Sequence, residues 1–123
     1  ERSRGLGDVY KRQGRLGEEK AADYLQQKGY IILDRNWHLK HRELDIVCMY
    51  ENMLVIVEVK TRNTPEERPG ELLDFRKCRN LRRAADAYVK AKGIGMEGRF
   101  DLIVLTGQSL EIEHIQEVIQ IFE

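Results

Sequence analysis

Residues 43–60 read Glu-Leu-Asp-Ile-Val-Cys-Met-Tyr-Glu-Asn-Met-Leu-Val-Ile-Val-Glu-Val-Lys, two apolar runs on either side of a short polar pair. The runs are rich in β-branched side chains, and the pair between them, Glu51 and Asn52, has the length of a tight turn. This pattern predicts an antiparallel β-hairpin. We therefore expect the two runs to lie side by side in one sheet, with the remaining chain packed around them.

The predicted hairpin brings charged side chains together at its open end. With the turn centred on the polar pair, Asp45 faces Glu58 and Glu43 faces Lys60. Opposed side chains lie about 5 Å apart, and two carboxylates at such a distance repel by roughly 3–4 kcal/mol at an effective dielectric of about 20. A cation would relieve that repulsion, and hard oxygen ligands suit Mg²⁺ or Mn²⁺.

The solvated face of an ordinary hairpin is the alternative explanation of these charges. Four apolar side chains share the face with the acids: Val47, Met49, Leu54 and Ile56. The face is thus apolar near the turn and charged at the other end, as in a buried strand whose end opens into a cleft. This arrangement favours a chemical site over a solvated surface.

Residues 14–28 have helical periodicity and end before a glycine. Glu18 lies on the same stripe as three apolar residues, Ala21, Ala22 and Leu25, so it is expected to point toward the core. It is either a first-turn acid that the helix dipole favours or the third acid of the site.

Residues 70–92 predict a second helix with a strongly basic face. Lys77 shares the apolar stripe of this helix, so it either reaches the cleft and a phosphate or extends its ammonium group to solvent. The neighbouring face carries four arginines and no acid: Arg76, Arg79, Arg82 and Arg83. Such a run is often only a solvated helix surface. In this chain the concentration of cations beside the candidate site favours phosphate contacts, which weaken steeply with salt.

The other segments complete a mixed sheet. Strands are predicted at 30–37, 99–106 and 110–115, with a short helix or strand from there to residue 123. Residues 62–70, which contain two prolines, predict a loop that is either a plain connector or a segment that closes over substrate. The resulting order, helix, three strands, helix, two strands, fits a small α/β domain.

Several polar residues outside the hairpin are assigned to structure or to phosphate contacts. His38 and His41 lie in a basic segment without helical periodicity, so phosphate contact is favoured over a zinc site. Asp101 is expected to be a structural partner of Arg99 rather than a further site acid, and His114 is expected to be structural.

Length and composition limit the possible functions. The chain has 123 residues, enough for one core, and 21 Lys and Arg balance 21 Asp and Glu, so net charge alone attracts no polyanion. No apolar run reaches the length of a membrane span, and the two cysteines lack metal or redox spacing. We expect a cytoplasmic protein with reduced thiols.

Residues 1–13, without periodicity, are set apart as a flexible tail, a translation or cloning remnant or a basic arm, which leaves 14–123 as a single domain.

An acid that opens one strand, followed by Glu-x-Lys at the end of the next, resembles the core of the PD-(D/E)-x-K nuclease superfamily. The wider pattern resembles the UPF0102 (YraN-like) family, which is similar to archaeal Holliday junction resolvases. The matching segments, from residue 14 to about 115, are Gly14-x-x-Gly17-Glu18, Ala22, Tyr24-Leu25, Gly29-Tyr30, Arg35-Asn36, Glu43-Leu44-Asp45-Ile46, Val57-Glu58-Val59-Lys60-x-Arg62, Lys77, Ala85 and Arg99-Phe100-Asp101. One departure is Arg42, where the family usually has glycine, and a bulky cation there would alter the approach to the site.

The resemblance implies a three-layer, restriction-endonuclease-like α/β fold, with a mixed sheet of about five strands and helices on both faces. It implies an endonuclease that uses Mg²⁺ or Mn²⁺ to hydrolyse phosphodiester bonds in DNA, branched or structured DNA in particular, and a homodimer that cuts two strands symmetrically.

The resemblance also implies roles for individual residues. Asp45 and Glu58 would bind the metal together with the carbonyl of Val59, and Glu18 would complete or orient the site. Lys60 would position the attacking water or help to deprotonate it. The secondary candidate is Glu43, as a partner of Lys60. The residues expected to hold nucleic acid are Lys77, Arg76, Arg79, Arg83 and Arg62.

Two other functions remain open. A nucleic-acid-binding adaptor with the same fold needs the basic helix but not the carboxylates, so Asp45→Asn would leave its binding intact. A small interaction domain unrelated to nucleic acid would bind no Mg²⁺. The intact set of Asp45, Glu58 and Lys60 disfavours both, because a protein without catalysis has no chemical reason to keep opposed acids.

Overall fold

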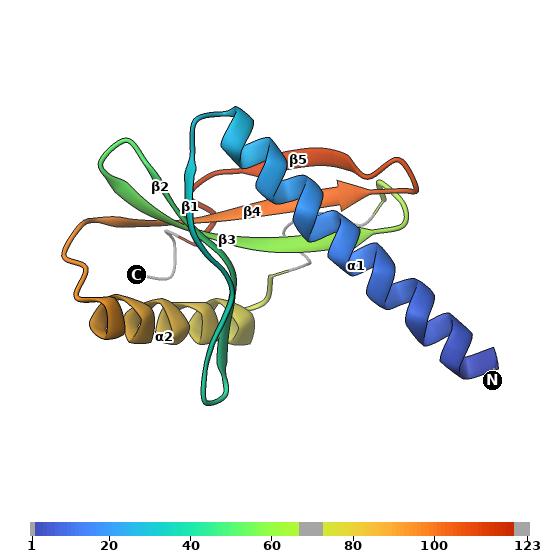
Figure 1. Ribbon diagram of the computed structural model, residues 1–123, viewed down its shortest axis with the longest axis horizontal. Coiled ribbons are helices and arrows are strands. Elements are labelled where there is room, and N and C mark those ends of the chain that lie inside the picture. Colours follow the sequence, from blue (N-terminus) through green and yellow to red (C-terminus); the bar gives the residue numbers. More distant parts are fainter. Residues whose placement is uncertain (1, 67–72, 120–123) are drawn as a thin grey trace.

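The computed structural model describes residues 2–66 and 73–119. Its elements follow one another in the predicted order: α1 (Arg2–Gln27), β1 (Ile31–Leu39), β2 (Arg42–Tyr50), β3 (Met53–Arg62), α2 (Phe75–Lys92), β4 (Gly98–Thr106) and β5 (Glu111–Ile115). Within the described residues, five strands form one mixed sheet between two helices (Figure 1). The predicted α/β class and its three layers are confirmed.

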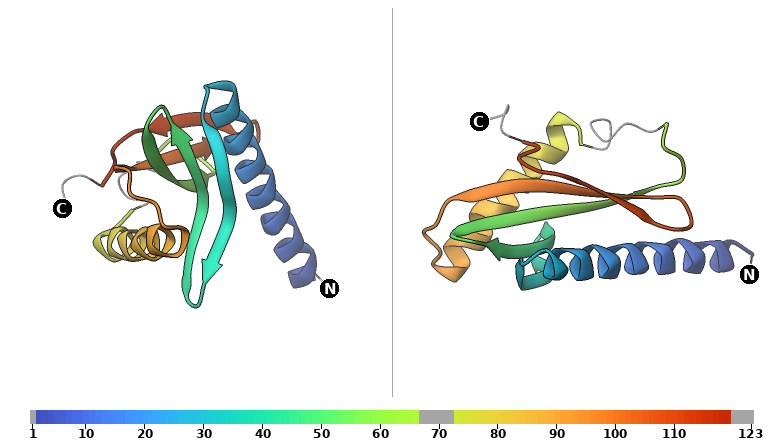
Figure 2. Two further views of the ribbon diagram at one scale, coloured as in Figure 1. Left: turned by 60° about the vertical axis from the view of Figure 1, so that its left-hand side comes forward. Right: turned by 90° about the horizontal axis from the view of Figure 1, so that it is seen from above.

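The strands lie in the sheet in their chain order, from β1 to β5. β3 and β4 run parallel and are joined through α2, whereas the other neighbouring strands are antiparallel. Because parallel neighbours require a crossover connection, α2 must lie over one face of the sheet. The left view of Figure 2 shows β1 and β2 of the sheet between α2 on one side and α1 on the other.

Side chains of the strands alternate between two apolar clusters. The cluster on the α1 face contains Ala21, Ala22, Leu25, Tyr30, Ile46, Cys48, Val55, Val57, Ile103 and Leu105. The cluster on the α2 face contains Leu44, Val47, Leu54, Ile56, Leu73, Cys78, Leu81, Ala84, Ala85, Tyr88, Leu102, Val104 and Ile119. The central strands are therefore covered on both faces, which explains their nearly continuous apolar runs. The two cysteines are free, as expected for reduced thiols.

Gly17 allows α1 to approach β3 closely. A Cβ atom placed on Gly17 would lie only 2.9 Å from Cγ2 of Thr61 and 3.6 Å from Cδ1 of Leu105. The missing side chain thus lets the helix backbone rest on the sheet.

The helices begin at different residues from those predicted. α1 starts at Arg2 rather than at Gly14, so it continues through most of the segment that the sequence analysis set apart. α2 starts at Phe75, because the side chain of Asp74 caps the helix by accepting a hydrogen bond from the Lys77 amide; the predicted start at residue 70 lies outside the described residues. Neither helix, in its described residues, is long and apolar enough to cross a membrane.

The remaining strands and loops follow the prediction closely. β1 runs two residues further than expected, and β5 matches the predicted last strand. Part of the predicted loop at 62–70, and the end of the segment that follows β5, lie outside the described residues.

The predicted hairpin of β2 and β3 is confirmed, with a ladder shorter than expected. Pairing runs from Tyr50↔Met53, beside the turn, to Ile46↔Val57. The prediction that the four charged residues at the open end form two further ladder pairs is therefore wrong.

The backbone of β2 twists where the ladder ends. Leu44 and Val47 both pack in the α2 cluster, while Ile46 packs in the α1 cluster. Strict alternation would place Leu44 with Ile46. The strand therefore rotates between residues 44 and 46 and separates from β3, and the charged residues lie at this separation.

Candidate active site

Where β2 and β3 separate, the side chain of Asp45 takes the place of a backbone hydrogen-bond partner for β3. Neither Asp45–Glu58 nor Glu43–Lys60 forms as a ladder pair, because β2 has already left β3. Instead Oδ2 of Asp45 accepts a hydrogen bond of 2.9 Å from the Val59 amide. A side-chain oxygen thus satisfies a strand N–H that no neighbouring strand reaches.

The carbonyl of Val59 lies on the same side as its amide. The N–H and C=O groups of one residue in a strand point the same way. Because the amide of Val59 reaches Asp45, its carbonyl faces the same gap between β2 and β3. This direction agrees with the expected role of that carbonyl as an oxygen ligand.

Glu58 is a largely buried acid beside Asp45. Its side chain is 15% exposed. Burial, then the charge of Asp45 and a hydrogen bond between the two carboxyl groups, raise the pKa of Glu58 to about 7. The ammonium of Lys60 lies 3.3 Å from Oε2 of Glu58 and lowers the pKa only in part. Near neutral pH, a cation at this site would compete with a proton for Glu58.

Lys60 lies between Glu58 and Lys77. Burial lowers the pKa of Lys60, but hydrogen bonding with Lys77 and attraction to Glu58 outweigh it, so the pKa of Lys60 is raised. The same hydrogen bond, then burial, lowers the pKa of Lys77. The raised pKa keeps Lys60 charged, and Lys77 lines the same cavity from α2; its contact with a phosphate stays a prediction.

A cavity of about 500 Å³ opens at Glu58 and Lys60, a size typical of ligand pockets. Its lining comes from the β1–β2 turn, the strand ends and α2: Lys40, His41, Arg42, Glu43, Glu58, Lys60, Lys77, Asn80 and Leu81. The sequence analysis did not assign Lys40 or Asn80 to the site, and it expected Arg42 only to alter the approach to the site. The signal for two of them was the basic segment that precedes Glu43.

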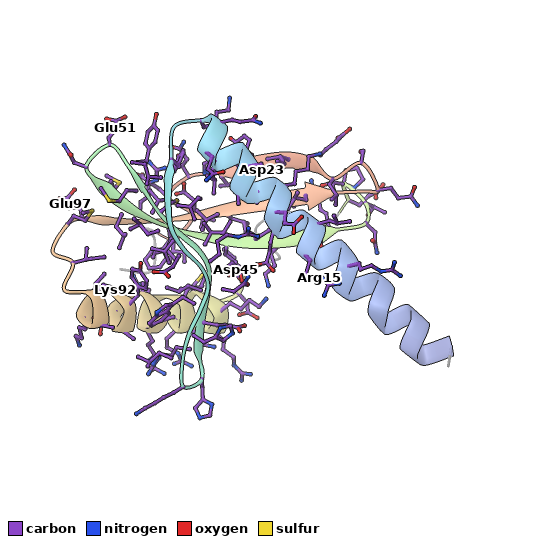
Figure 3. All side chains as sticks on the ribbon, in the orientation of Figure 1. Arg15, Asp23, Asp45, Glu51, Lys92 and Glu97 are labelled. Carbon is purple, nitrogen blue, oxygen red and sulfur yellow. The ribbon has the colours of Figure 1, made fainter. Side chains whose placement is uncertain are left out.

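Glu18 approaches Asp45 from the α1 side of the sheet. Burial, then the charge of Asp45, raise the pKa of Glu18, although Arg35 opposes the rise. Its Oε1 atom is buried and has no hydrogen-bond partner within the described part of the chain. Glu18 thus lies near one of the predicted site residues, Asp45. Figure 3 shows Asp45 near the centre of the molecule, with Arg15 on the adjacent part of α1.

Glu18 does not line the cavity that contains Glu58. It lines a second cavity, of about 310 Å³, with residues of α1 and β1: Arg15, Glu19, Arg35 and Asn36. Asp45 links the two sides electrostatically, because its charge raises the pKa of both Glu18 and Glu58.

Glu43 lines the larger cavity but interacts elsewhere. Oε2 of Glu43 lies 3.1 Å from Nε2 of His38 across the β1–β2 hairpin, and both side chains are largely exposed. An exposed pair of this kind contributes little to stability. The structure therefore pairs Glu43 with His38 rather than with Lys60.

Most of the predicted nucleic-acid contacts are exposed on α2. Arg76, Arg79 and Arg83 are exposed there, and Arg79 lies 5.8 Å from the ring centroid of Phe75. Arg62 differs: its side chain is only 9% exposed, and Nε donates a hydrogen bond of 2.7 Å to Thr106. Arg62 thus ties β3 to β4 and does not line the cavity.

The acids form an oxygen-rich but incomplete set for a metal ion. Among residues 2–66 and 73–119, no three His, Cys, Asp or Glu side chains form a group that could hold a metal. Two adjacent carboxyl groups and a carbonyl facing the same gap are nevertheless the donor chemistry that suits Mg²⁺, which keeps several waters and completes its shell with substrate phosphates. The raised pKa of Glu58 indicates a shortage of positive charge at the same place.

Asp101 has the structural role that was predicted. Its buried carboxylate accepts two hydrogen bonds of 2.9 Å from Arg99 and lies 2.7 Å from Nε2 of His114. Arg99 also donates to the hydroxyl of Tyr30, and Nδ1 of His114 lies 3.1 Å from the hydroxyl of Tyr24. This network ties β4 and β5 to the end of α1 and is separate from the cavity at Glu58.

Comparison with known proteins gives a family. The model of the "Uncharacterised protein family UPF0102" matches residues 17–105. A UPF0102 protein of Bacteroides thetaiotaomicron is 49% identical over 107 residues, which cover 85% of this chain and 88% of the relative. A UPF0102 protein of Phocaeicola vulgatus is 45% identical over the same shares of both chains. A UPF0102 protein of Caldanaerobacter subterraneus subsp. tengcongensis is 35% identical over 89% of this chain and 93% of the relative. The chain therefore belongs to the UPF0102 family.

Proposed function

We propose that this protein is a metal-dependent endonuclease that hydrolyses phosphodiester bonds in DNA. One observation carries the proposal: Glu58, buried beside Asp45 and 3.3 Å from Lys60, lies at the base of a cavity whose walls are basic. Carboxylates at the bottom of the cavity attract a divalent cation, and cationic side chains on its walls attract phosphates. Together they suit a phosphodiester.

Asp45 and Glu58 would hold Mg²⁺ or Mn²⁺, with the carbonyl of Val59 as a further ligand. A bound divalent ion supplies Lewis acidity to the phosphate and lowers the pKa of a bound water. Glu18, on the other side of Asp45, would add negative charge that favours cation binding.

Lys60 would stabilise the negative charge that develops on the phosphate oxygens. Its raised pKa keeps the ammonium charged, so positioning of the water and stabilisation of charge suit it better than removal of a proton. The contact with Glu58 fixes the position of the ammonium group before substrate binds.

Lys77 and the exposed arginines of α2 would hold phosphates on either side of the one that is cut. Lys77 lines the cavity next to Lys60. Arg76, Arg79 and Arg83 extend the positive surface along the helix. Contacts of this kind position the nucleic acid without reading its sequence, which suits a nuclease that recognises the structure of DNA, such as a branch.

A nucleic-acid-binding adaptor that does not cut is the second candidate. It is favoured by the lack of a complete three-ligand metal group among the described residues. It is also favoured by the hydrogen bond between Asp45 and Val59, which gives one of the acids a structural reason to be present.

Cleavage assays with a panel of labelled substrates distinguish the two candidates. The panel holds a four-way junction, a flap, a single strand, a linear duplex and an RNA hairpin, each with Mg²⁺ or Mn²⁺. The test variant is Asp45→Asn, which keeps an oxygen that can accept the Val59 amide, and the matched control is Asp23→Asn on the exposed face of α1.

We expect metal-dependent cuts that Asp45→Asn abolishes and Asp23→Asn leaves unchanged. Wild-type protein that binds a substrate in a salt-sensitive manner, yet cuts it with neither metal, would favour the adaptor. The substrate that is cut fastest identifies the class of DNA.

A further inference from the structure

The turn between β1 and β2 forms a protruding basic tip. The last ladder pair of the two strands is Leu39↔Arg42, so Lys40 and His41 make the turn itself. Figure 1 shows this turn extending past α2, and the left view of Figure 2 shows the same from another side. All three residues from Lys40 to Arg42 are exposed, and we refer to them as the ribbon tip.

Lys40 occupies a backbone conformation that does not suit a lysine. Its φ angle is 58°, in the left-handed region where glycine and asparagine are favoured. Lysine therefore costs free energy at this place in the turn.

The ribbon tip also faces the candidate active site. Lys40, His41 and Arg42 line the cavity at Glu58, opposite Lys77 and Asn80 of α2. The cations of the ribbon tip thus lie across the cavity from Lys77 and Asn80, with Glu58 between the two sides.

We propose that the ribbon tip grips a double-stranded arm of the nucleic acid beside the cleavage site, with Lys40 and Arg42 bound to phosphates. This inference rests on the proposed function, because it names the partner of the same site. A two-stranded ribbon has the width to enter the major groove of a duplex, which is about 12 Å wide. Entry of the protruding turn into the groove brings its cations to the phosphates at the groove edges, while one strand continues into the cavity.

Binding measured without divalent ions tests the grip separately from cleavage. Fluorescence anisotropy with a labelled duplex, and with a single strand of the same length, is recorded over a range of salt concentrations in EDTA. The test variant is Lys40→Gly. Because glycine suits a φ of 58°, it removes the cation without a loss of stability, which thermal unfolding checks.

Two control variants separate the effect of the cation from other changes. Glu51→Gly relieves the same strain, since Glu51 has a φ of 56°, and Figure 3 shows it in the β2–β3 turn, far from the ribbon tip. Lys90→Ala removes one positive charge near the end of α2, from an exposed pair with Asp86.

We expect Lys40→Gly to lose about 5–10-fold in affinity for the duplex at about 0.1 M salt, with a salt slope smaller by about one. The control variants keep wild-type affinity and slope, and single-strand affinity changes little. Duplex affinity in Lys40→Gly equal to that of Lys90→Ala would overturn the inference, as would an equal loss on the single strand.

The outcome also separates this inference from the proposed function. Binding that depends on Lys40, in a protein that cuts nothing with Mg²⁺ or Mn²⁺, supports the grip and contradicts the nuclease. Cleavage by a protein whose duplex affinity is independent of Lys40 supports the nuclease and contradicts the grip. A wild-type protein that binds no nucleic acid overturns both.

Discussion

Replacement of Glu58 by glutamine should stabilise the protein at alkaline pH. The pKa of Glu58 rises from its ordinary value of 4.5 to about 7 because of burial first and Asp45 second. Above pH 7, Glu58 is ionised in the unfolded and the folded protein, so folding buries a charged carboxylate next to another acid. The neutral amide introduced by Glu58→Gln avoids that cost at every pH.

The size and direction of the effect follow from the two pKa values. Between pH 4.5 and about 7 the folded protein binds more protons at Glu58 than the unfolded chain does, so the free energy of unfolding falls as pH rises through this range. The difference corresponds to about 3 kcal/mol at most. Because the substitution would leave Lys60 without its charged partner, we expect a gain of about 2 kcal/mol at about pH 8.5 and almost none at about pH 5.

Urea unfolding of wild type and Glu58→Gln at the two pH values measures the effect. Exposed Glu111 provides the control, and Glu111→Gln should leave the pH dependence unchanged. A Glu58→Gln variant that is destabilised equally at both pH values would refute the account of Glu58 as a strained acid.

The same assay tests cation binding. Mg²⁺ at about 100 times its dissociation constant should stabilise wild type by about 2.7 kcal/mol at alkaline pH. Glu58→Gln should gain much less, because one ligand is lost. Equal stabilisation of both proteins would place the cation elsewhere.

Three further predictions concern packing, the buried network and catalysis. Gly17→Ala should lower the free energy of unfolding in urea by about 1–3 kcal/mol, because its Cβ would meet Thr61 at 2.9 Å. The control Gly14→Ala has open space around its Cβ, so it should be neutral or slightly stabilising. A Gly17→Ala protein as stable as wild type would contradict the close approach of α1 to β3. Asp101→Asn should cost about 3–5 kcal/mol in thermal unfolding, because it leaves Arg99 without its buried partner, and a loss below about 1 kcal/mol would count against that network. Lys60→Met should abolish cleavage but keep DNA affinity within about threefold, as anisotropy can measure, whereas an equal loss of both would assign Lys60 to binding.

The sequence was informative where side chains alternate and uninformative where backbone pairing ends. The ladder from Tyr50↔Met53 to Ile46↔Val57 follows from the two apolar runs and the turn between them. The separation of β2 from β3 beyond the Ile46↔Val57 pair depends on the rotation that packs Leu44 against α2. That rotation is a tertiary effect, which no local pattern contains.

The observed starts of the two helices differ from the predicted ones, and the reason is different for each helix. Periodicity detects a helix only where one face is buried, and α1 begins well before the part that packs on the sheet. For α2 a signal was present, because Asp74 is a favourable N-cap residue.

The candidate site was predicted in composition more than in arrangement. Glu58, Lys60 and Lys77 do line one cavity. Whether Glu18 would join them could not be read from the chain, since a stripe position gives the direction of a side chain within its helix but not the side of Asp45 on which it lies. Lys40 lines the cavity because the β1–β2 turn and α2 come together there, which is a tertiary arrangement.

The hydrogen bond from the Val59 amide to Asp45 changes how the history of this site can be interpreted. A lineage that lost catalysis would still be under selection to keep an acceptor at position 45, because a buried strand amide without a partner costs about 1–3 kcal/mol. Asp45 therefore has a structural role in addition to any catalytic one. Retention of Glu58 and Lys60 is more informative, and a relative that keeps Asp45 but has lost both would be a natural example of the fold without the chemistry.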